Sequence, residues 1–320
     1  MVRNGSCCGS TAAPVEGLTM FDYLLNEKNF SSLNEYTRFL NDLPATLNEI
    51  QRFSKSFQSQ GHVMMTPPSA SLLTQAATMN ALCWRAVQIT VPQLAFASGR
   101  VVTQVSTLLE EFREELRKAS GPARRMALQD IDPRRFTPAG SNSAGTNRPR
   151  DVVVIMRNLV QQLEGCERAS AQFKSQIVQI AQTIHSIFVR FIESLSMRLC
   201  ICDGPVSKIE AYYSLGHFGL PVMHYDPQAG YSLEQRLEKA REHLQALFGM
   251  YAQATSAANN LGDFCHRMNF YLNVVKTELL FNDGHQTLAR ANLSLATIVQ
   301  PIEELRTMSN GLLRLSSKLQ

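Results

Sequence analysis

The sequence has little charge for its length and no long apolar run. Charged residues make up 18% of the 320 residues, below the roughly 25% of an average soluble protein. No stretch reaches the roughly 18 uninterrupted apolar residues of a membrane-spanning helix. The first residues contain no apolar signal-peptide core, and Val2 rather than glycine occupies the myristoylation position. We therefore expect neither a membrane-spanning segment nor conventional secretion, while leaderless export remains open.

Motifs of nucleotide-binding and hydrolytic enzymes are also missing. The chain contains no P-loop, no glycine-rich dinucleotide fingerprint, no G-x-S-x-G and no H-E-x-x-H. Acidic pairs such as Glu110-Glu111 lie in patches on predicted helix surfaces, where they more often solvate a face than transfer protons. We predict that the protein is not an enzyme and uses no cofactor.

Cysteine is present, but its pattern does not suit disulfides. The seven cysteines are odd in number and irregularly spaced. Cys83, Cys166 and Cys265 fall on apolar stripes of predicted helices, where free cysteine packs as a small hydrophobic residue. This usage favours a reducing compartment, so we expect a cytoplasmic protein.

One cluster contains residue types that bind zinc. Cys200 and Cys202, together with His217 and His224, could supply two thiolates and two imidazoles. Their gaps of one and six residues differ from the usual zinc spacings, and the two cysteines point to different sides of a helix. An apolar helix end followed by two loop histidines is the favoured interpretation, so we predict no metal.

The basic residues gather in one segment. Eight Lys or Arg and two Asp between Arg117 and Arg150 give that segment a net charge of +6, against +4 for the whole chain. The Pro, Gly, Ser and Arg content of residues 121–150 predicts a disordered basic linker. Phe136 is its one aromatic residue, so the stacking platform of single-strand binders is missing. Nucleic acid is therefore an unexpected partner, whereas an anionic membrane remains a candidate.

The strongest positive signal is a long repeat of apolar residues at helical spacing. From Leu233 to Leu279, alternate steps of four and three residues meet fourteen apolar positions without exception. Such a row, which we call a seam, has the 3.5-residue period of helices that pack side by side in coiled coils. The segment from Asp151 to about Cys202 repeats the pattern with one polar interruption, Ser170.

Two further long helices are predicted at residues 69–120 and 285–320. Pro92 should kink the first, whose stripe includes Leu94, Ala97 and Val101, and Gly121-Pro122 should end it. Pro301 should kink the last helix or begin a new one. Shorter helices are expected at 18–28 and at 32–60, the latter opened by a Ser32 cap.

These helices are too long to fold into a compact globule. A helix of about 50 residues is roughly 75 Å long, so the helices must lie side by side. The short turn at residues 282–284 makes the last two helices antiparallel neighbours. We predict an all-α protein, an elongated antiparallel bundle of long coiled-coil-like helices with a small loop or tip insertion. Its parts are a disordered tail (1–17), N-terminal helices (18–120), a disordered basic linker (121–150) and long antiparallel helices (151–320) with a tip at 203–231.

The tip at residues 203–231 is the candidate functional segment. Bundles need roughly 2–8 residues to reverse direction, whereas this connection has 29 and is rich in aromatic residues and glycine. It is either a folded cap on the bundle or an aromatic tip that contacts a protein or a bilayer interface. The candidate interaction residues are Tyr212, Tyr213, Phe218, Leu220, Met223 and Tyr225.

Two functional hypotheses follow. The first is a non-enzymatic helical scaffold or interaction protein that binds another protein through its helix faces or the 203–231 tip. The alternative is a membrane-acting or secretion-machine-delivered α-helical protein of the toxin or effector type that uses the aromatic tip. Long bundles with an apolar tip recur in α-helical pore-forming toxins, in tip or translocator proteins of bacterial secretion machines, and in cytoskeletal and tethering proteins. The chain resembles these proteins in architecture only. Both hypotheses allow oligomers.

Overall fold

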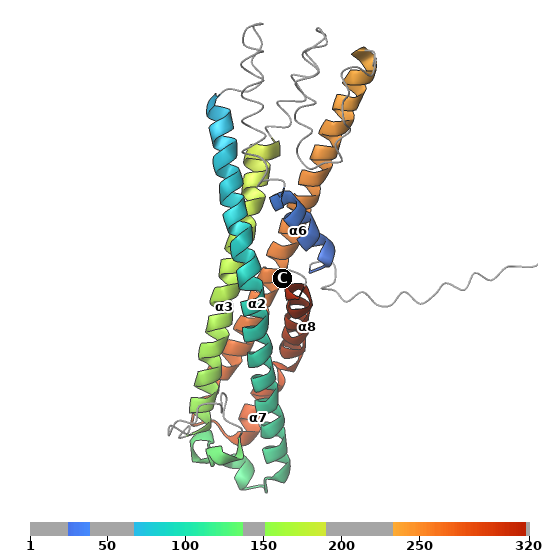
Figure 1. The fold of residues 1–320 in the computed structure, drawn as a ribbon. Helices are drawn as coiled ribbons and strands as arrows, with labels where there is room; N and C mark the ends of the chain where they lie inside the picture. Colours follow the sequence, from blue (N-terminus) through green and yellow to red (C-terminus); the bar gives the residue numbers. More distant parts are fainter. Residues whose placement is uncertain (1–24, 39–66, 137–150, 190–232, 318–320) are drawn as a thin grey trace, which may run out of the picture.

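The protein is an elongated bundle of antiparallel helices. The computed structural model describes residues 25–38, 67–136, 151–189 and 233–317. In Figure 1, α2 and α6 run in one direction along the bundle, and α3 and α8 run in the other. The predicted all-α antiparallel bundle is therefore confirmed. Its helices are residues 27–38, α2 (Pro67–Lys118), α3 (Val152–Thr183), α6 (Leu233–Phe281), α7 (Leu288–Ala296) and α8 (Val299–Ser316).

Two of the predicted seams meet in the interface between α3 and α6. Every predicted seam residue from Val152 to Ile184 is buried, and so is every one from Tyr251 to Leu279. Ser170, the polar interruption, is also buried, and its hydroxyl donates a hydrogen bond to the carbonyl of Cys265 at 3.4 Å. The polar position is therefore accommodated because a backbone acceptor of the neighbouring helix faces it.

The helix boundaries follow local capping chemistry. The Asp151 carboxylate accepts a hydrogen bond from the Val154 amide at 2.8 Å and so caps the start of α3. The helix α2 ends at Lys118, close to the predicted stop, and Pro92 lies inside it without dividing it. Pro301 lies in the first turn of α8, where a missing amide removes no intrahelical hydrogen bond.

The predicted boundary between two N-terminal helices is wrong where the structure describes it. Residues 27–38 form a single helix, and Ser32 lies inside it. The Asn26 side chain accepts a hydrogen bond from the Asn29 amide at 2.8 Å, which is the contact of an N-cap. The cap therefore precedes the predicted one, Ser32, by six residues. The rest of both predicted helices lies outside the described residues.

The prediction of a disordered linker is wrong for residues 121–136, which fold against one end of the bundle. Leu128, Ile131 and Phe136 are buried there, and the Phe136 ring centroid lies 4.8 Å from that of Phe112. Three apolar side chains anchor a segment whose arginines stay on the surface. Residues 137–150 lie outside the described residues. The backbone of the folded part forms three 3₁₀ turns, η1 (Ala123–Arg125), η2 (Leu128–Asp130) and η3 (Pro133–Arg135).

Backbone hydrogen bonds tie this segment to the turn between α6 and α7. The Leu128 amide donates to the Gln286 carbonyl at 2.9 Å, and the Leu288 amide donates to the Met126 carbonyl at 3.0 Å. These are the contacts of a short antiparallel pair around Ala127 and Thr287. The segment and the turn therefore hold each other in place.

Candidate interaction surfaces

The predicted tip residues lie outside the described residues, but the helices that lead to them are placed. The helix α3 continues as a π-helical turn, η4 (Ile184–Val189), at the end of the bundle where α6 begins. The chain therefore leaves α3 and enters α6 at the same end (Figure 1). The residues outside are the interaction candidates Tyr212, Tyr213, Phe218, Leu220, Met223 and Tyr225 and the zinc candidates Cys200, Cys202, His217 and His224.

The described part of the chain contains neither a metal-binding cluster nor a membrane-spanning helix. Within residues 25–38, 67–136, 151–189 and 233–317, no group of three or more His, Cys, Asp or Glu side chains could hold a metal ion. In the same ranges, no helix combines the length and the apolar character that a membrane crossing requires.

The three described cysteines are core residues, as their place on apolar stripes predicts. Cys83, Cys166 and Cys265 are buried and free. Burial, with a smaller contribution from the nearby Glu167 carboxylate, raises the pKa of Cys166 to about 11. The reactive form of cysteine is the thiolate, so these thiols stay protonated near neutral pH and act as packing groups.

A buried polar cluster fastens helix 27–38 to α2 and α6. The Tyr36 hydroxyl accepts a hydrogen bond from Asn80 Nδ2 at 2.9 Å, and the rings of Tyr36 and Tyr251 meet edge to face at 5.8 Å. Desolvation raises the pKa of both tyrosines, and for Tyr36 the neighbouring Tyr251 adds to the rise while the Asn80 hydrogen bond opposes it. Both hydroxyls are therefore neutral hydrogen-bonding groups.

An open groove lies beside this cluster, between helix 27–38 and α2. Its volume is about 540 Å³, and its lining includes Leu82, Trp84 and the two arginines Arg38 and Arg85. Among the described residues, the lining contains no acidic side chain, and neither arginine forms an ion pair. The described walls of the groove therefore combine apolar surface with two positive charges, which suits an acidic and partly apolar ligand.

The exposed face of α2 is also apolar and weakly basic beyond the groove. Five large apolar side chains project from it, with exposed fractions between 45% and 69%. Between Pro67 and Leu109 the only charged residues are Arg85 and Arg100. The helix therefore presents an apolar, weakly basic stripe to solvent. Its members are Leu72, Met79, Leu82, Ile89 and Phe96.

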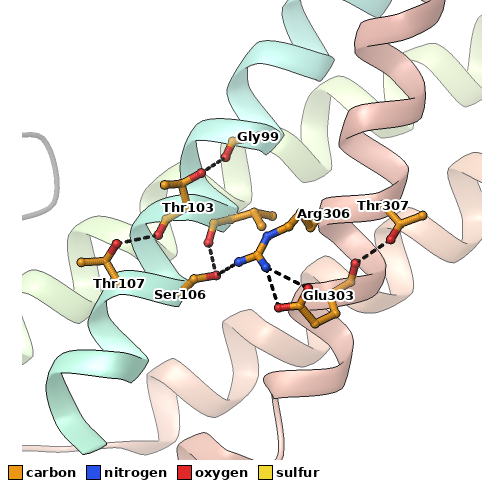
Figure 2. A network of polar contacts seen from close by, with 8 residues as sticks. Gly99, Thr103, Ser106, Thr107, Glu303, Arg306 and Thr307 are labelled. Carbon is orange, nitrogen blue, oxygen red and sulfur yellow. Dashed lines mark hydrogen bonds and ion pairs between the residues drawn. The ribbon is translucent and has the colours of Figure 1, made fainter. Parts of the chain in front are cut away.

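By contrast, the face of α2 that packs against α8 is joined to that helix by a polar network. The Arg306 guanidinium donates to Ser106 Oγ at 2.6 Å and to the Glu303 carboxylate at 2.7 Å. Figure 2 shows Arg306 reaching from α8 to α2. On α2, the Thr103 hydroxyl donates to the Gly99 carbonyl and the Thr107 hydroxyl donates to the Thr103 carbonyl. The two helices are therefore joined by charge-assisted hydrogen bonds as well as by packing.

The described residues define an elongated helical bundle with an exposed apolar face on α2. The chain matches no protein-family model and no curated protein sequence. Its structure is similar to the crystal structure of XaxA from Xenorhabdus nematophila, with a TM-score of 0.62 and 11% sequence identity, over 92% of this chain and 98% of that chain. It is also similar to the XaxAB pore complex from the same organism, with a TM-score of 0.56 and 12% identity over the same shares of the two chains. At these identities the likeness shows a shared fold.

Proposed function

We propose that this protein is a membrane-acting component of a pore complex, which is a narrower form of the alternative hypothesis of a membrane-acting or machine-delivered α-helical protein. The observation that carries the proposal is the likeness in fold to XaxA and to the XaxAB pore complex, which extends over 92% of this chain. In this proposal the bundle is a rigid stalk, and the chain acts together with further copies and with a protein partner. This proposal is compatible with part of the scaffold hypothesis, because a stalk that binds a protein partner is also a non-enzymatic scaffold.

The division of labour between stalk and tip has a physical basis. The seam residues of α3 from Val152 to Ile184 and of α6 from Tyr251 to Leu279 are buried, so these two helices use their seams for internal packing. The 203–231 connection has aromatic and aliphatic residues that the seams do not use. Tyrosine is favoured where an apolar region meets water. We infer that Phe218, Leu220, Met223 and Tyr225, with Tyr212 and Tyr213, make the first contact with the target membrane.

Vesicle flotation tests this proposal. The full chain is mixed with phosphatidylcholine vesicles containing phosphatidylserine and compared with a variant in which residues 212–225 are replaced by a Gly/Ser turn. We expect the full chain to float with the vesicles and the variant to stay in solution, with equal helix content and equal midpoints of thermal unfolding. A Leu293→Ser variant, altered at an exposed apolar side chain of α7, serves as the matched control and should float.

Three outcomes count against the proposal. Flotation that survives the replacement would remove the tip from the membrane contact. Unfolding of the variant would make the segment a structural cap, the other interpretation of the sequence. A full chain that binds a protein but no vesicle would restore the scaffold hypothesis, and the expected cytoplasmic location would then gain support.

A further inference from the structure

The helix α2 has two apolar seams, and the bundle buries only one. The buried seam includes Val87, Leu94 and Val101, which pack against the other helices. The exposed seam consists of Leu72, Met79, Leu82, Ile89 and Phe96, whose intervals are seven, three, seven and seven residues. All five fall on one series of alternate three- and four-residue steps, as the a and d positions of a coiled coil do, and the other three positions of this series are Gln75, Ala86 and Gln93.

The period of the exposed seam indicates what covers it. Isolated exposed apolar residues are normal on a protein surface, but five on one heptad series are not isolated. On a straight helix a 3.5-residue series rotates by about 20° per heptad, hence roughly 70° between Leu72 and Phe96. A flat bilayer does not follow this rotation, whereas a second helix follows it by supercoiling. The seam spans about 36 Å, so it accommodates a helix of about 24 residues.

The charges beside the seam indicate the chemistry of that helix. Arg85 and Arg100 are exposed on α2, and Arg38 lies across the groove that Leu82 also lines. No acidic residue accompanies them between Pro67 and Leu109. A second copy of α2 packed on the same seam would bring arginine toward arginine, which is unfavourable. A helix with acidic residues along its edges would instead form ion pairs at a partly desolvated position.

We propose that the exposed seam of α2 is the docking surface for one amphipathic helix of a partner protein. That helix has apolar residues at 3.5-residue spacing and Asp or Glu at its edges, and it places acidic residues in the groove beside Arg38 and Arg85. The inference goes beyond the proposed function, because it assigns a surface of a described helix and concerns binding in solution without a membrane.

Peptide binding to the full chain tests this docking surface. The probe is a fluorescently labelled peptide of four heptads with Leu or Ile at a and d and Glu at e and g, and the matched peptide has Lys at e and g. Fluorescence anisotropy at low salt should show at least tenfold tighter binding of the Glu peptide. A Leu82→Glu/Ile89→Glu variant should bind neither peptide, and an Arg38→Glu/Arg85→Glu variant should reverse the preference. A Leu293→Glu variant, altered at a side chain that is 72% exposed on α7, should bind like the natural chain.

Four results would overturn the proposal. The first is that neither peptide binds the natural chain, and the second is that the seam variant binds as the natural chain does. The third is a dimer in sedimentation equilibrium that the seam variant loses, which would assign the seam to a second copy. The fourth is vesicle flotation that the seam variant loses without any peptide binding, which would assign the seam to lipid. None of these results depends on the 212–225 replacement, so the two proposals fail separately.

Discussion

The Ser309 hydroxyl on α8 lies 2.8 Å from the Ser98 hydroxyl on α2, and both side chains are fully buried. Ser98 also donates to the Leu94 carbonyl at 2.7 Å, within its own helix. Each hydroxyl therefore has a partner in an otherwise apolar contact, and the small side chains let α2 and α8 approach closely. The predicted apolar stripe of α2 included Ala97, but Ala97 is exposed and the neighbouring Ser98 is buried.

This contact predicts that volume matters more than polarity at position 98. Ser98→Leu inserts three additional carbon atoms between two packed helices and should lower the free energy of unfolding by about 1–3 kcal/mol. Ser98→Ala should cost less than about 1 kcal/mol, because Ser309 also bonds the Leu305 carbonyl. Urea unfolding followed by circular dichroism measures both variants. Equal losses in the two would show that the hydrogen bond, and not the spacing, controls this interface.

The folded segment at residues 121–136 predicts a large effect of a residue outside the long helices. Phe136→Ala removes a ring that is 2% exposed and packed on Phe112, so the free energy of unfolding should fall by about 3–5 kcal/mol. Met126→Ala, at a side chain that is 42% exposed, is the control and should change it by less than about 0.5 kcal/mol. Similar small effects of both substitutions in thermal unfolding would mean that the segment does not contribute to the fold.

The buried tyrosines predict a loss of stability in alkaline solution. Desolvation raises the pKa of Tyr36 and Tyr251 above the ordinary 10.0. Above pH 10 the unfolded chain loses these protons while the folded chain keeps them, so rising pH favours unfolding, by up to about 1.4 kcal/mol per pH unit and group. Below that pH the tyrosines contribute no pH dependence. Cys166, whose pKa rises from 9.0 to about 11, begins the same trend near pH 9.

Tyr36→Phe separates the hydroxyl from the ring in this experiment. At pH 8 the variant should be less stable by about 1–3 kcal/mol, because the buried Asn80 amide loses its acceptor. Between pH 10 and 11 its urea midpoint should fall less steeply than that of the natural chain, since one titrating group is gone. Parallel curves for the two proteins would exclude Tyr36 as a source of the alkaline loss.

The one ion pair between α3 and α6 in the described residues predicts a measurable coupling. Lys276 Nζ lies 2.5 Å from a Glu167 carboxylate oxygen, with side chains 19% and 22% exposed. A double-mutant cycle with Lys276→Met and Glu167→Gln should give an interaction energy of about 0.5–1.5 kcal/mol, above that of fully exposed pairs. The coupling should shrink in 1 M NaCl, because salt screens partly exposed charges. An interaction energy of zero in this cycle would show that the two helices are held together by their seams alone.

The sequence by itself determined the long helices and the buried faces of α3 and α6. Heptad spacing predicted the buried positions from Val152 to Ile184 and from Tyr251 to Leu279 one by one, including the polar exception at Ser170. The Asp151 cap and a helix boundary near Pro301 could be predicted because they depend on residues within one turn, although α8 begins at Val299 and Pro301 is its third residue. Such features depend on residues that are near one another in the sequence, so capping patterns and helical periodicity are enough to predict them.

Only the tertiary structure decided which surfaces remain and what the short segments do. The basic segment at 121–136 folds because three scattered apolar residues reach the end of the bundle. Composition does not reveal contacts such as that between Leu128 and Gln286, which are 158 positions apart. On α2, Ser98 is buried and Ala97 is exposed because α8 packs against the face that carries Ser98. The spacing of the second seam of α2, from Leu72 to Phe96, is present in the sequence. Only the packing of the bundle shows that these side chains stay exposed. Burial depends on partners distant in the chain, and periodicity alone does not assign them.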